Sequence, residues 1–382
     1  MLKIFRINKK LLKHLDFGII IICIIIMLFG SLNILSATQY IYRGNNIVST
    51  TINFHFLKMH LLWLMVGLFV MYLILLIDYK VIQGYANIIY WCGIFLLLLN
   101  ALFPVKVNGA ESWLKLGPLP QFQPSEFVKI ALIIMIAKQL DEMEGNINNI
   151  KNFLILSVYS IIPVIFLLKQ PDMGMTMFLF FILLGMFFIA GLNSKAIVGG
   201  LIGVSAAIAL VWNSGLIRIY QKNRLISFLY PDLDPLGTGL QLTMAQIGIG
   251  KGGIFGTGFL KGSWAAVGST PESSTDCIFS VLGEEWGLVG AIFLLTLYGL
   301  LIYRLIKIAK DSKDIFGTML TAGIISMFLF SILQNIGMNI GIMPITGLTL
   351  PFMSYGGSSI ITTFICIGLV LNVGMRRKKF NF

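Results

Sequence analysis

Residues 17–37 read FGIIIICIIIMLFGSLNILSA, a run of twenty-one residues that contains no charged side chain. A helix needs about 20 mostly apolar residues to cross the hydrocarbon core of a membrane. We therefore predict a membrane-spanning helix here. The run is too long for the apolar core of a secretory signal, and no small-residue cleavage site follows it before a polar segment. We do not expect a cleaved signal peptide.

Similar apolar runs recur along the whole chain. Together with the first they predict ten spans, centred on 17–37, 56–77, 83–104, 123–139, 152–168, 172–192, 196–213, 277–303, 316–336 and 350–374. The predicted fold class is all-α: a polytopic membrane protein of about ten transmembrane helices, with residues 1–382 forming a single integral membrane domain. One long segment, 214–276, contains no span and is predicted to be a large, structured extracytoplasmic loop between spans 7 and 8.

The composition excludes several classes of protein. Of the 382 residues, 57% are hydrophobic and 12% are charged, whereas soluble domains are roughly 45–50% apolar and about 25% charged. This excludes a soluble enzyme, and it also excludes a disordered chain, which needs low hydrophobicity and high charge. The net charge is +12. In membrane proteins such an excess lies in cytoplasmic loops, so we expect no nucleic-acid partner.

The basic residues predict the orientation of the chain in the membrane. An even number of spans places both termini on one side, and both terminal segments are basic. With both termini in the cytoplasm, 17 Lys and Arg lie on the cytoplasmic side and 10 lie outside. Lys and Arg are enriched in cytoplasmic loops. We therefore predict a multi-pass protein of the bacterial cytoplasmic (inner) membrane with both termini cytoplasmic.

The long loop is expected to be ordered because it carries apolar stretches. We predict short helices that lie on the outer leaflet or dip into it, over Leu225–Leu229, Leu240–Ile249 and Gly253–Leu260. Gly248, Gly250 and Gly253 match a G-x-G-x-x-G pattern. No strand, turn and helix surround it, so we interpret it as a glycine-rich turn rather than a nucleotide site.

Carboxylates near or within spans are candidates for function because they are rare and costly in a membrane. Nine fall within spans or at the outer face: Glu111, Glu126, Asp172, Asp232, Asp234, Glu272, Asp276, Glu284 and Glu285. Glu126 and Lys129 are three residues apart in a helical run and can therefore pair, either to fix helix packing or to contact substrate. Asp172 begins a span, where it can cap the helix or act in a site.

The most polar cluster, PESSTD at residues 271–276, lies where the long loop re-enters the membrane. A carboxylate at such a low-dielectric edge can have its pKa raised toward neutrality, which suits a general base. The alternative is that Asp276 caps the following helix. No His or Cys spacing fits a metal site.

Several segments, in order, resemble signatures of the SEDS family (shape, elongation, division and sporulation). They are GAESW at 109–113, QPSEFVK at 123–129, QPDMG at 170–174, DPLG at 234–237, GKGG at 250–253, PESSTDCIFSVLGEE at 271–285, NIGM at 335–338 and PFMSYGGSS at 351–359. The spacing in the long loop is closer to the RodA branch than to the FtsW branch. Ser112, Ser274 and Cys277 depart from the family pattern, which has an often basic residue, His and Phe at these positions.

The resemblance implies a ten-span glycosyltransferase that polymerises lipid II into glycan strands at the outer face of the membrane. Such a reaction inverts the sugar and releases undecaprenyl pyrophosphate. The essential aspartate of the family corresponds to Asp276, which is the predicted catalytic residue. The predicted substrate-binding residues are Trp113, Lys115, Gln123, Glu126, Lys129, Asp172, Arg224, Lys251, Lys261 and Glu272.

The chemistry needs a base for the acceptor hydroxyl and positive charge for the departing pyrophosphate. The sequence leaves open whether Lys115, Arg224, Lys251, Lys261 or a divalent cation (Mg²⁺ or Mn²⁺) supplies this charge, and no cofactor is otherwise expected. The expected partner is a single-span class B penicillin-binding protein, a transpeptidase. Two alternatives remain: a lipid II transporter and a non-catalytic scaffold of the cell-wall machinery. The sequence does not distinguish roles in elongation, division and sporulation.

Overall fold

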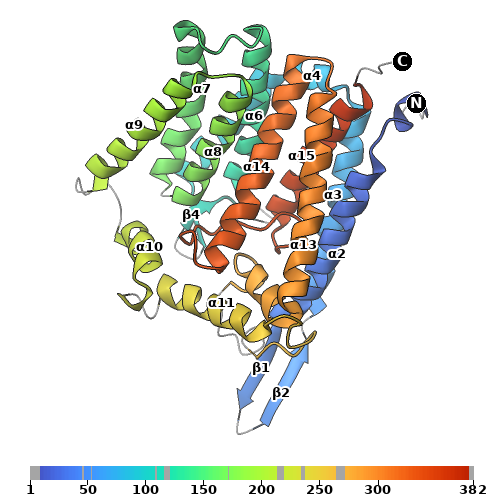
Figure 1. Ribbon diagram of the computed structural model, residues 1–382, viewed down its shortest axis with the longest axis vertical. Helices are drawn as coiled ribbons and strands as arrows, with labels where there is room; N and C mark the ends of the chain where they lie inside the picture. The colour runs from blue at the N-terminus through green and yellow to red at the C-terminus, as the bar shows by residue number, and fades with distance from the viewer. Residues whose placement is uncertain are drawn as a thin grey trace.

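The computed structural model describes residues 9–44, 47–52, 54–107, 110–115, 121–170, 172–212, 219–233, 237–263 and 272–377. The bundle in Figure 1 consists of the helices α1 (Lys9–Leu12), α2 (Phe17–Ala37), α3 (Phe54–Leu76), α4 (Tyr79–Gly84), α5 (Ala86–Leu102), α6 (Pro124–Glu142), α7 (Ile150–Lys169), α8 (Met173–Ile189), α9 (Ser194–Trp212), α10 (Ile219–Leu229), η1 (Pro231–Leu233), α11 (Thr238–Gly252), α13 (Ile278–Lys310), α14 (Ile315–Asn339) and α15 (Gly357–Met375).

The all-α prediction is confirmed, and each predicted span corresponds to a helix. Within the described residues, six helices are long and apolar enough to cross a membrane: α2, α3, α7, α13, α14 and α15. Three more, α5, α8 and part of α9, are apolar but shorter. The remaining helix, α6, carries the charged pair Glu126 and Lys129. The chain is a multi-pass membrane protein, and the number of ten crossings stays a prediction.

The burial of the helices distinguishes the centre of the bundle from its edge. In α14 and α15, 72% and 78% of the most apolar window is buried, compared with 28% in α3 and 22% in α7. Aromatic contacts join the central helices, since Phe352 packs on Phe328 of α14 and on Phe364 of α15. Because α3 and α7 expose apolar faces, they form part of the surface that meets lipid.

Some helix boundaries differ from the predicted ones. The last helix begins at Gly357 rather than near residue 350. Pro351 has no N–H, and Phe352 has a φ of 63°, so the chain turns here before the helix starts. The third predicted span is divided at Tyr85 into α4 and α5. The predicted helix over Gly253–Leu260 is wrong: this stretch forms turns, with positive φ at Gly253, Gly256 and Gly258.

One end of the bundle carries ion pairs that link distant segments. The start of α2 and the end of α15 both lie at this end (Figure 1). Asp16 binds Arg304 at 2.7 Å, and Asp78 binds Arg376 at 3.0 Å. This is the end that the positive-inside rule predicts to be cytoplasmic. The gathering of these charges at one end agrees with an even number of crossings.

The opposite end carries the long-loop helices α10 and α11 and a two-stranded hairpin (Figure 1). The hairpin pairs β1 (Gln39–Gly44) with β2 (Ile47–Ile52), and a second small sheet pairs β3 (Val105–Val107) with β4 (Ala110–Trp113). The sequence analysis predicted neither hairpin. Both hairpins are short and lie between spans, where the apolar runs of the neighbouring helices dominate the hydrophobic pattern of the sequence.

Candidate active site

Asp276 lies immediately before α13, at the same end of the bundle as α10 and α11 (Figure 1). The N-cap of α13 is Cys277, and no side chain caps this helix. The alternative that Asp276 serves as the cap is therefore wrong. The carboxyl is half-buried, and a Cβ placed on Gly347 would lie 3.4 Å from its Oδ2. The side chain is left available for chemistry.

Four residues from the C-terminal third hold the main chain around Asp276. Asn335 and Asn339 of α14 donate from Nδ2 to the Asp276 carbonyl at 2.9 and 3.1 Å. Ser354 Oγ donates to the Thr275 carbonyl at 2.6 Å, and the Tyr355 N–H donates to the Ser274 carbonyl at 2.9 Å. These supporting residues were not among the predicted site residues. Three of them, Asn335, Ser354 and Tyr355, lie in the NIGM and PFMSYGGSS segments that the sequence singled out, and Asn339 directly follows NIGM.

The electrostatic surroundings of Asp276 favour a proton acceptor that works near neutral pH. Burial, and after it the charge of the nearby Glu272 carboxylate, raise the pKa of the Asp276 carboxyl to about 7, while the charge of Arg224 acts in the opposite direction. Burial disfavours the charged form, and a like charge adds to this effect. Glu272 itself is exposed and has a left-handed φ of 54°. Its Oε2 accepts a hydrogen bond from Thr275 at 2.9 Å.

Asp172 caps α8 and also binds Gln123, and its role in a functional site stays a prediction. Its Oδ1 caps α8 by accepting from the Met175 N–H at 3.0 Å, and its Oδ2 accepts from Gln123 Nε2 at 3.3 Å. Burial raises the pKa of the Asp172 carboxyl, whereas the Met175 N–H, Ser112, Arg224 and Gln123 oppose this shift. Gln123 also donates from its main chain to Ser358 Oγ at 3.4 Å. The Asp172 carboxylate therefore caps α8 with one oxygen and binds Gln123 with the other.

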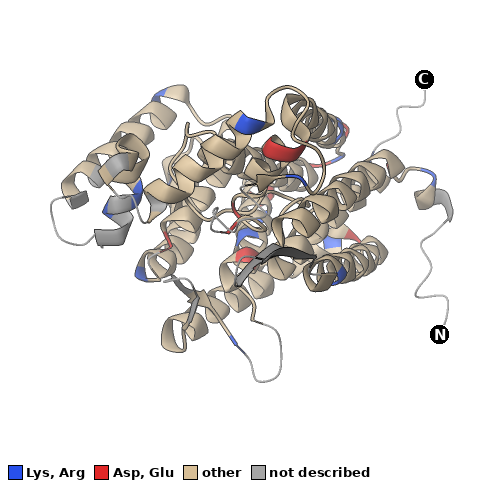
Figure 2. Ribbon diagram, turned by 90° about the horizontal axis from the view of Figure 1, so that it is seen from below, with Lys and Arg blue, Asp and Glu red and all other residues tan. Residues whose placement is uncertain are grey.

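Arg224 of α10 connects the two aspartates. Its charge acts on both Asp172 and Asp276, although the three residues come from different parts of the chain. The candidate site, as we use the term below, consists of Asp276, Glu272, Arg224, Asp172 and Gln123. Figure 2, which looks onto this end, shows charged positions scattered among otherwise uncharged helices.

Glu126 and Lys129 form the predicted ion pair, with Lys129 Nζ 2.9 Å from Glu126 Oε1. Both side chains are 6% exposed. The ammonium also lies 4.1 Å from the centroid of the Phe178 ring of α8. The structure thus places the pair inside the bundle, where it joins α6 to α8. Direct contact with substrate stays a prediction.

The other predicted residues lie on β4, on α11 and on the segments that follow these two elements. Trp113 is half-buried at the end of β4, and Lys115 is exposed two residues later. Lys251 lies in the last turn of α11, Lys261 lies ten residues later, and both are exposed. Gln241 of α11 contacts Cys277 Sγ at 3.2 Å. Because α11 rises about 1.5 Å per residue, Lys251 lies about 15 Å further along it. Among the predicted cations, Arg224 is the one whose charge acts on the pKa of Asp276.

The candidate site does not have the donor set of a protein-held metal ion. Among the described residues, no group of three His, Cys, Asp or Glu side chains comes together as ligands. Mg²⁺ and Mn²⁺ prefer six oxygen ligands, and the carboxylates of Asp172, Glu272 and Asp276 do not form one such group. We therefore derive no step through a divalent cation.

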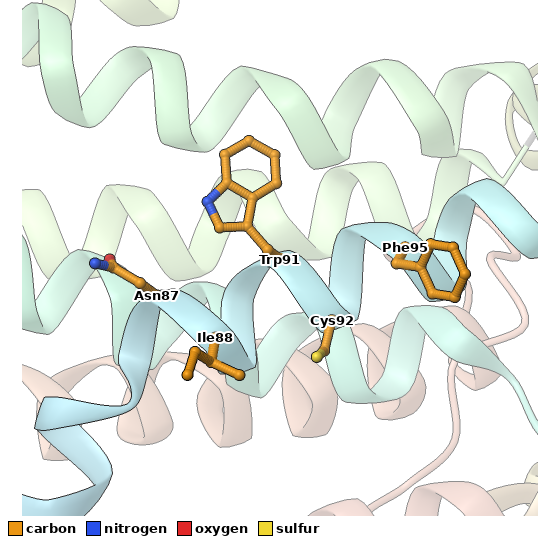
Figure 3. Close-up of a pocket in the computed structure, with 5 residues that line it drawn as sticks. All are labelled: Asn87, Ile88, Trp91, Cys92 and Phe95. Atoms are coloured by element: carbon orange, nitrogen blue, oxygen red, sulfur yellow. The ribbon is translucent and has the colours of Figure 1, made fainter.

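An apolar recess of about 390 Å³ lies on the outward face of α5. Figure 3 shows its lining: Asn87, Ile88, Trp91, Cys92 and Phe95, at successive turns of one helix. Ile88, Trp91 and Phe95 are more than half exposed. A face of this kind suits the hydrocarbon of lipids.

The fold and the candidate site define a class: a helical, multi-pass membrane protein with a partly buried acid–arginine cluster at one end. The sequence profile described as "Cell cycle protein", for the FtsW, RodA and SpoVE proteins, matches residues 16–379. The chain belongs to this family. It is 34% identical to stage V sporulation protein E of Bacillus subtilis, covering 94% of this chain and 96% of that protein. It is also 34% identical to peptidoglycan glycosyltransferase MrdB of Escherichia coli, covering 98% of each.

Solved structures show the same fold. One, described as structural coordination of polymerization and crosslinking by a peptidoglycan synthase complex, matches with a TM-score of 0.80 and 31% identity, over 96% of this chain and 99% of that chain. The crystal structure of the rod shape determining protein RodA of Thermus thermophilus matches with a TM-score of 0.71 and 29% identity, over 96% and 98%. The recognition of the SEDS family from the sequence is confirmed.

Proposed function

We propose that this protein is a peptidoglycan glycosyltransferase that polymerises lipid II at the outer face of the cytoplasmic membrane. Its relative from Escherichia coli, which aligns over 98% of both chains, is named a peptidoglycan glycosyltransferase. The observation that carries the proposal is Asp276, a half-buried carboxyl with a pKa of about 7 that lies close to the charge of Arg224. A base and a cation in one cluster are what glycosyl transfer from a pyrophosphate requires.

In the proposed reaction, Asp276 accepts the proton of the acceptor sugar hydroxyl. The hydroxyl oxygen then attacks the anomeric carbon of the donor sugar and forms the new glycosidic bond. The bond from that carbon to the pyrophosphate oxygen breaks, and undecaprenyl pyrophosphate leaves with the electron pair. Attack opposite the leaving group inverts the anomeric carbon. The proton remains on Asp276 until solvent removes it.

Arg224 is the proposed partner of the leaving pyrophosphate. It is the predicted cation whose charge acts on both aspartates, and a guanidinium matches phosphate oxygens with two parallel hydrogen bonds. Asp172 holds Gln123 at the edge of the cluster, where the amide can meet sugar hydroxyls. The prenyl tails would lie along the lipid-facing apolar faces of the bundle.

The proposed partner is a single-span class B penicillin-binding protein. The support is the likeness, over 96% of this chain, to a structure described as a peptidoglycan synthase complex that coordinates polymerization and crosslinking. With both termini in the cytoplasm, the candidate site faces outward, where a transpeptidase acts. Relatives named for sporulation and for glycan synthesis match at the same identity, so roles in elongation, division and sporulation remain open.

Purified protein in liposomes, supplied with labelled lipid II, tests the proposal. We expect glycan chains from the wild type and none from Asp276→Asn, because a positioned base typically contributes about 10²–10⁴-fold. Asn keeps the size of the side chain, and we expect an unchanged or higher melting temperature. Chain-length analysis and a thermal melt are the two readouts.

The same experiment separates the alternatives. Flipped lipid without glycan would indicate a transporter, and neither product would indicate a scaffold. Near-normal chains from the Asn variant would eliminate Asp276 as the base.

A further inference from the structure

Helix α13 is broken near its start, and the loop that follows α11 fills the break. Gly287 has a non-helical φ of 61° and ψ of −158°. The Thr257 and Gly258 N–H groups donate to the carbonyls of Glu284 and Glu285 at 2.9 and 3.1 Å. The N–H groups beyond the break, at Leu288 and Val289, donate to carbonyls of residues 253 and 254 at 3.0 and 3.1 Å. The hydrogen bonds that α13 loses are thus replaced by the loop.

Glycine allows the two backbones to approach this closely. A Cβ on Gly252 would lie 1.9 Å from the Gly283 carbonyl, and one on Gly256 would lie 2.1 Å from the Glu285 carbonyl. A side chain at either position would force the backbones apart. The turn after α11 is therefore fixed to α13 by main-chain contacts.

Two buried glutamates fix the next turn. Glu284 and Glu285 are each 1% exposed. Glu284 Oε1 accepts from the Ser263 N–H at 2.8 Å, and Glu285 Oε1 accepts from the Gly262 N–H at 3.3 Å and from Ser36 Oγ. Charge-assisted bonds to a carboxylate are strong. They hold residues 262–263 in one place.

The fixed residues 262–263 directly follow Lys261 and bind Lys251. The proposed chemistry at Asp276 uses neither lysine. Lys251 Nζ donates to Ser263 Oγ at 3.1 Å, and Lys261 lies two residues before Ser263 with its side chain exposed. Glu284 accepts from the same Ser263, so the glutamate positions Lys251 through the serine. The hydrogen bond to Ser263 brings the Lys251 ammonium to the segment of chain that also carries Lys261.

We infer that Lys251 and Lys261 form a second pyrophosphate subsite, which binds the acceptor lipid, and that Glu284 and Glu285 are its positioning residues. The inference rests on the proposed function. Arg224 serves the donor pyrophosphate beside Asp276, and the two lysines serve the other lipid, about 15 Å away along α11.

The separation fits the chemistry of the acceptor. Lipid II carries a disaccharide on its pyrophosphate, and the hydroxyl that reacts is on the sugar remote from the pyrophosphate. When that hydroxyl is at Asp276, its own pyrophosphate must lie two sugar rings away. Lys251 is ten residues beyond Gln241, the residue of α11 that contacts Cys277. This is a span of the same order as two linked sugar rings.

The direction also fits. Helix α11 lies across the end of the bundle rather than along it (Figure 1). Its two ends are therefore at a similar depth in the membrane. Both lipids are held by tails in one leaflet, so their two pyrophosphates must also lie at a similar depth.

Steady-state kinetics of glycan formation in liposomes test the subsite. For the double variant Lys251→Gln with Lys261→Gln we expect KM for lipid II to rise on the order of ten-fold or more, because each lost charged contact to phosphate weakens binding about ten-fold. We expect kcat to change less than about three-fold, since Asp276 and Arg224 remain. Lys58→Gln, which removes an exposed lysine from α3, is the matched control and should leave both constants unchanged.

A second substrate sharpens the test. A soluble disaccharide acceptor without pyrophosphate should be used equally well by the wild type and the double variant, because it cannot reach the lysines. Wild-type protein that makes no glycan would overturn the proposed function. If the wild type makes glycan and the double variant has a normal KM, only the subsite is overturned.

Further variants test whether Glu284 positions Lys251 through Ser263. Ser263→Ala removes the hydroxyl between Glu284 and Lys251 but keeps the main-chain hydrogen bond, and we expect a rise in KM of about three-fold with unchanged kcat. Glu284→Gln should raise KM further, and Lys251→Arg should restore near-normal binding because it keeps the charge. A fall in kcat without a change in KM for Ser263→Ala would contradict the positioning role.

Discussion

Asp172 and Asp276 lie in one charged cluster but have different surroundings. The carboxylate oxygens of Asp172 accept hydrogen bonds from Met175 and Gln123, which occupy them. The Asp276 carboxyl is instead approached by the backbone of Gly347 and by the charges of Glu272 and Arg224. A base must exchange its proton with substrate, so the less occupied carboxylate suits that role.

The raised pKa of Asp276 predicts the pH dependence of the reaction. The base works when ionised, so the rate should rise about ten-fold per pH unit from about pH 5 and level off above about pH 7. An equal rate at pH 5 and pH 8 would contradict this assignment.

Stability should change in the opposite sense. Because the pKa in the folded protein is raised from 3.8 to about 7, the folded state binds more protons than the unfolded state between these values. This group's contribution to stability is therefore lost as pH rises through about 7. Thermal melts of the wild type and of Asp276→Asn at pH 5 and pH 8 measure it, and the difference should favour the Asn variant at pH 8.

Gly347 is predicted to be intolerant of a side chain. Its φ is 74°, and a Cβ would lie 3.4 Å from Asp276 Oδ2. A left-handed conformation costs a non-glycine residue about 1–2 kcal/mol, and the methyl group would crowd the carboxyl. We expect Gly347→Ala to lower kcat by ten-fold or more with a modest loss of stability. The control is Gly200→Ala, where a Cβ meets nothing within 4 Å.

At the scale of elements, the Glu126–Lys129 pair allows the charged helix α6 to lie inside the bundle. The two charges compensate each other, and the Phe178 ring of α8 covers the ammonium. An uncompensated charge here would be buried away from water. This explains how a helix with few apolar positions at its start can still pack centrally.

Removing one charge of the pair should destabilise the protein. Breaking a buried pair typically costs about 3–5 kcal/mol because the remaining charge is left without its partner. We expect Glu126→Gln and Lys129→Met each to lower the free energy of unfolding by this order, and exchanging the two residues to recover part of it. Detergent-solubilised protein in a thermal or denaturant melt provides the measurement.

The same helix offers a control pair. Lys138 and Glu142 lie 3.5 Å apart, and Glu142 is 52% exposed. Exposed pairs contribute about 0–1 kcal/mol. If Lys138→Met were as damaging as Lys129→Met, burial would not be the cause.

At the scale of the whole molecule, the charged groups separate into two ends. Ion pairs tie α2, α13 and α15 together at the end of the two termini, while the candidate site lies with α10 and α11 at the other (Figure 1). The positive-inside rule predicts that the lysine-rich end faces the cytoplasm. On that prediction the candidate site faces outward.

Reporter fusions test this orientation. A cytoplasm-active reporter fused after Lys310 should be active, because the end of α13 belongs to the ion-paired end. The same reporter inserted near Gly262 should be silent. The reverse pattern would overturn the orientation and, with it, the outward-facing site.

The sequence by itself determined the membrane-spanning helices and the family, and it singled out Asp276 as the candidate base. Apolar runs of spanning length indicate helices because backbone groups in lipid must be satisfied within the segment. The spacing of Glu126 and Lys129 indicates a pair because three residues make nearly one helical turn. The ordered motifs indicated the family and, through it, Asp276.

Only the tertiary structure decided which of the many charged residues share a site. Apolar runs are alike in composition, so hydrophobicity does not encode which helix faces which. The approach of Arg224 to Asp172 and Asp276, and the exclusion of Asp276 as a helix cap, depend on contacts between segments far apart in the chain. The break at Gly287 likewise depends on a loop about 30 residues earlier, whose backbone replaces the hydrogen bonds that the helix gives up.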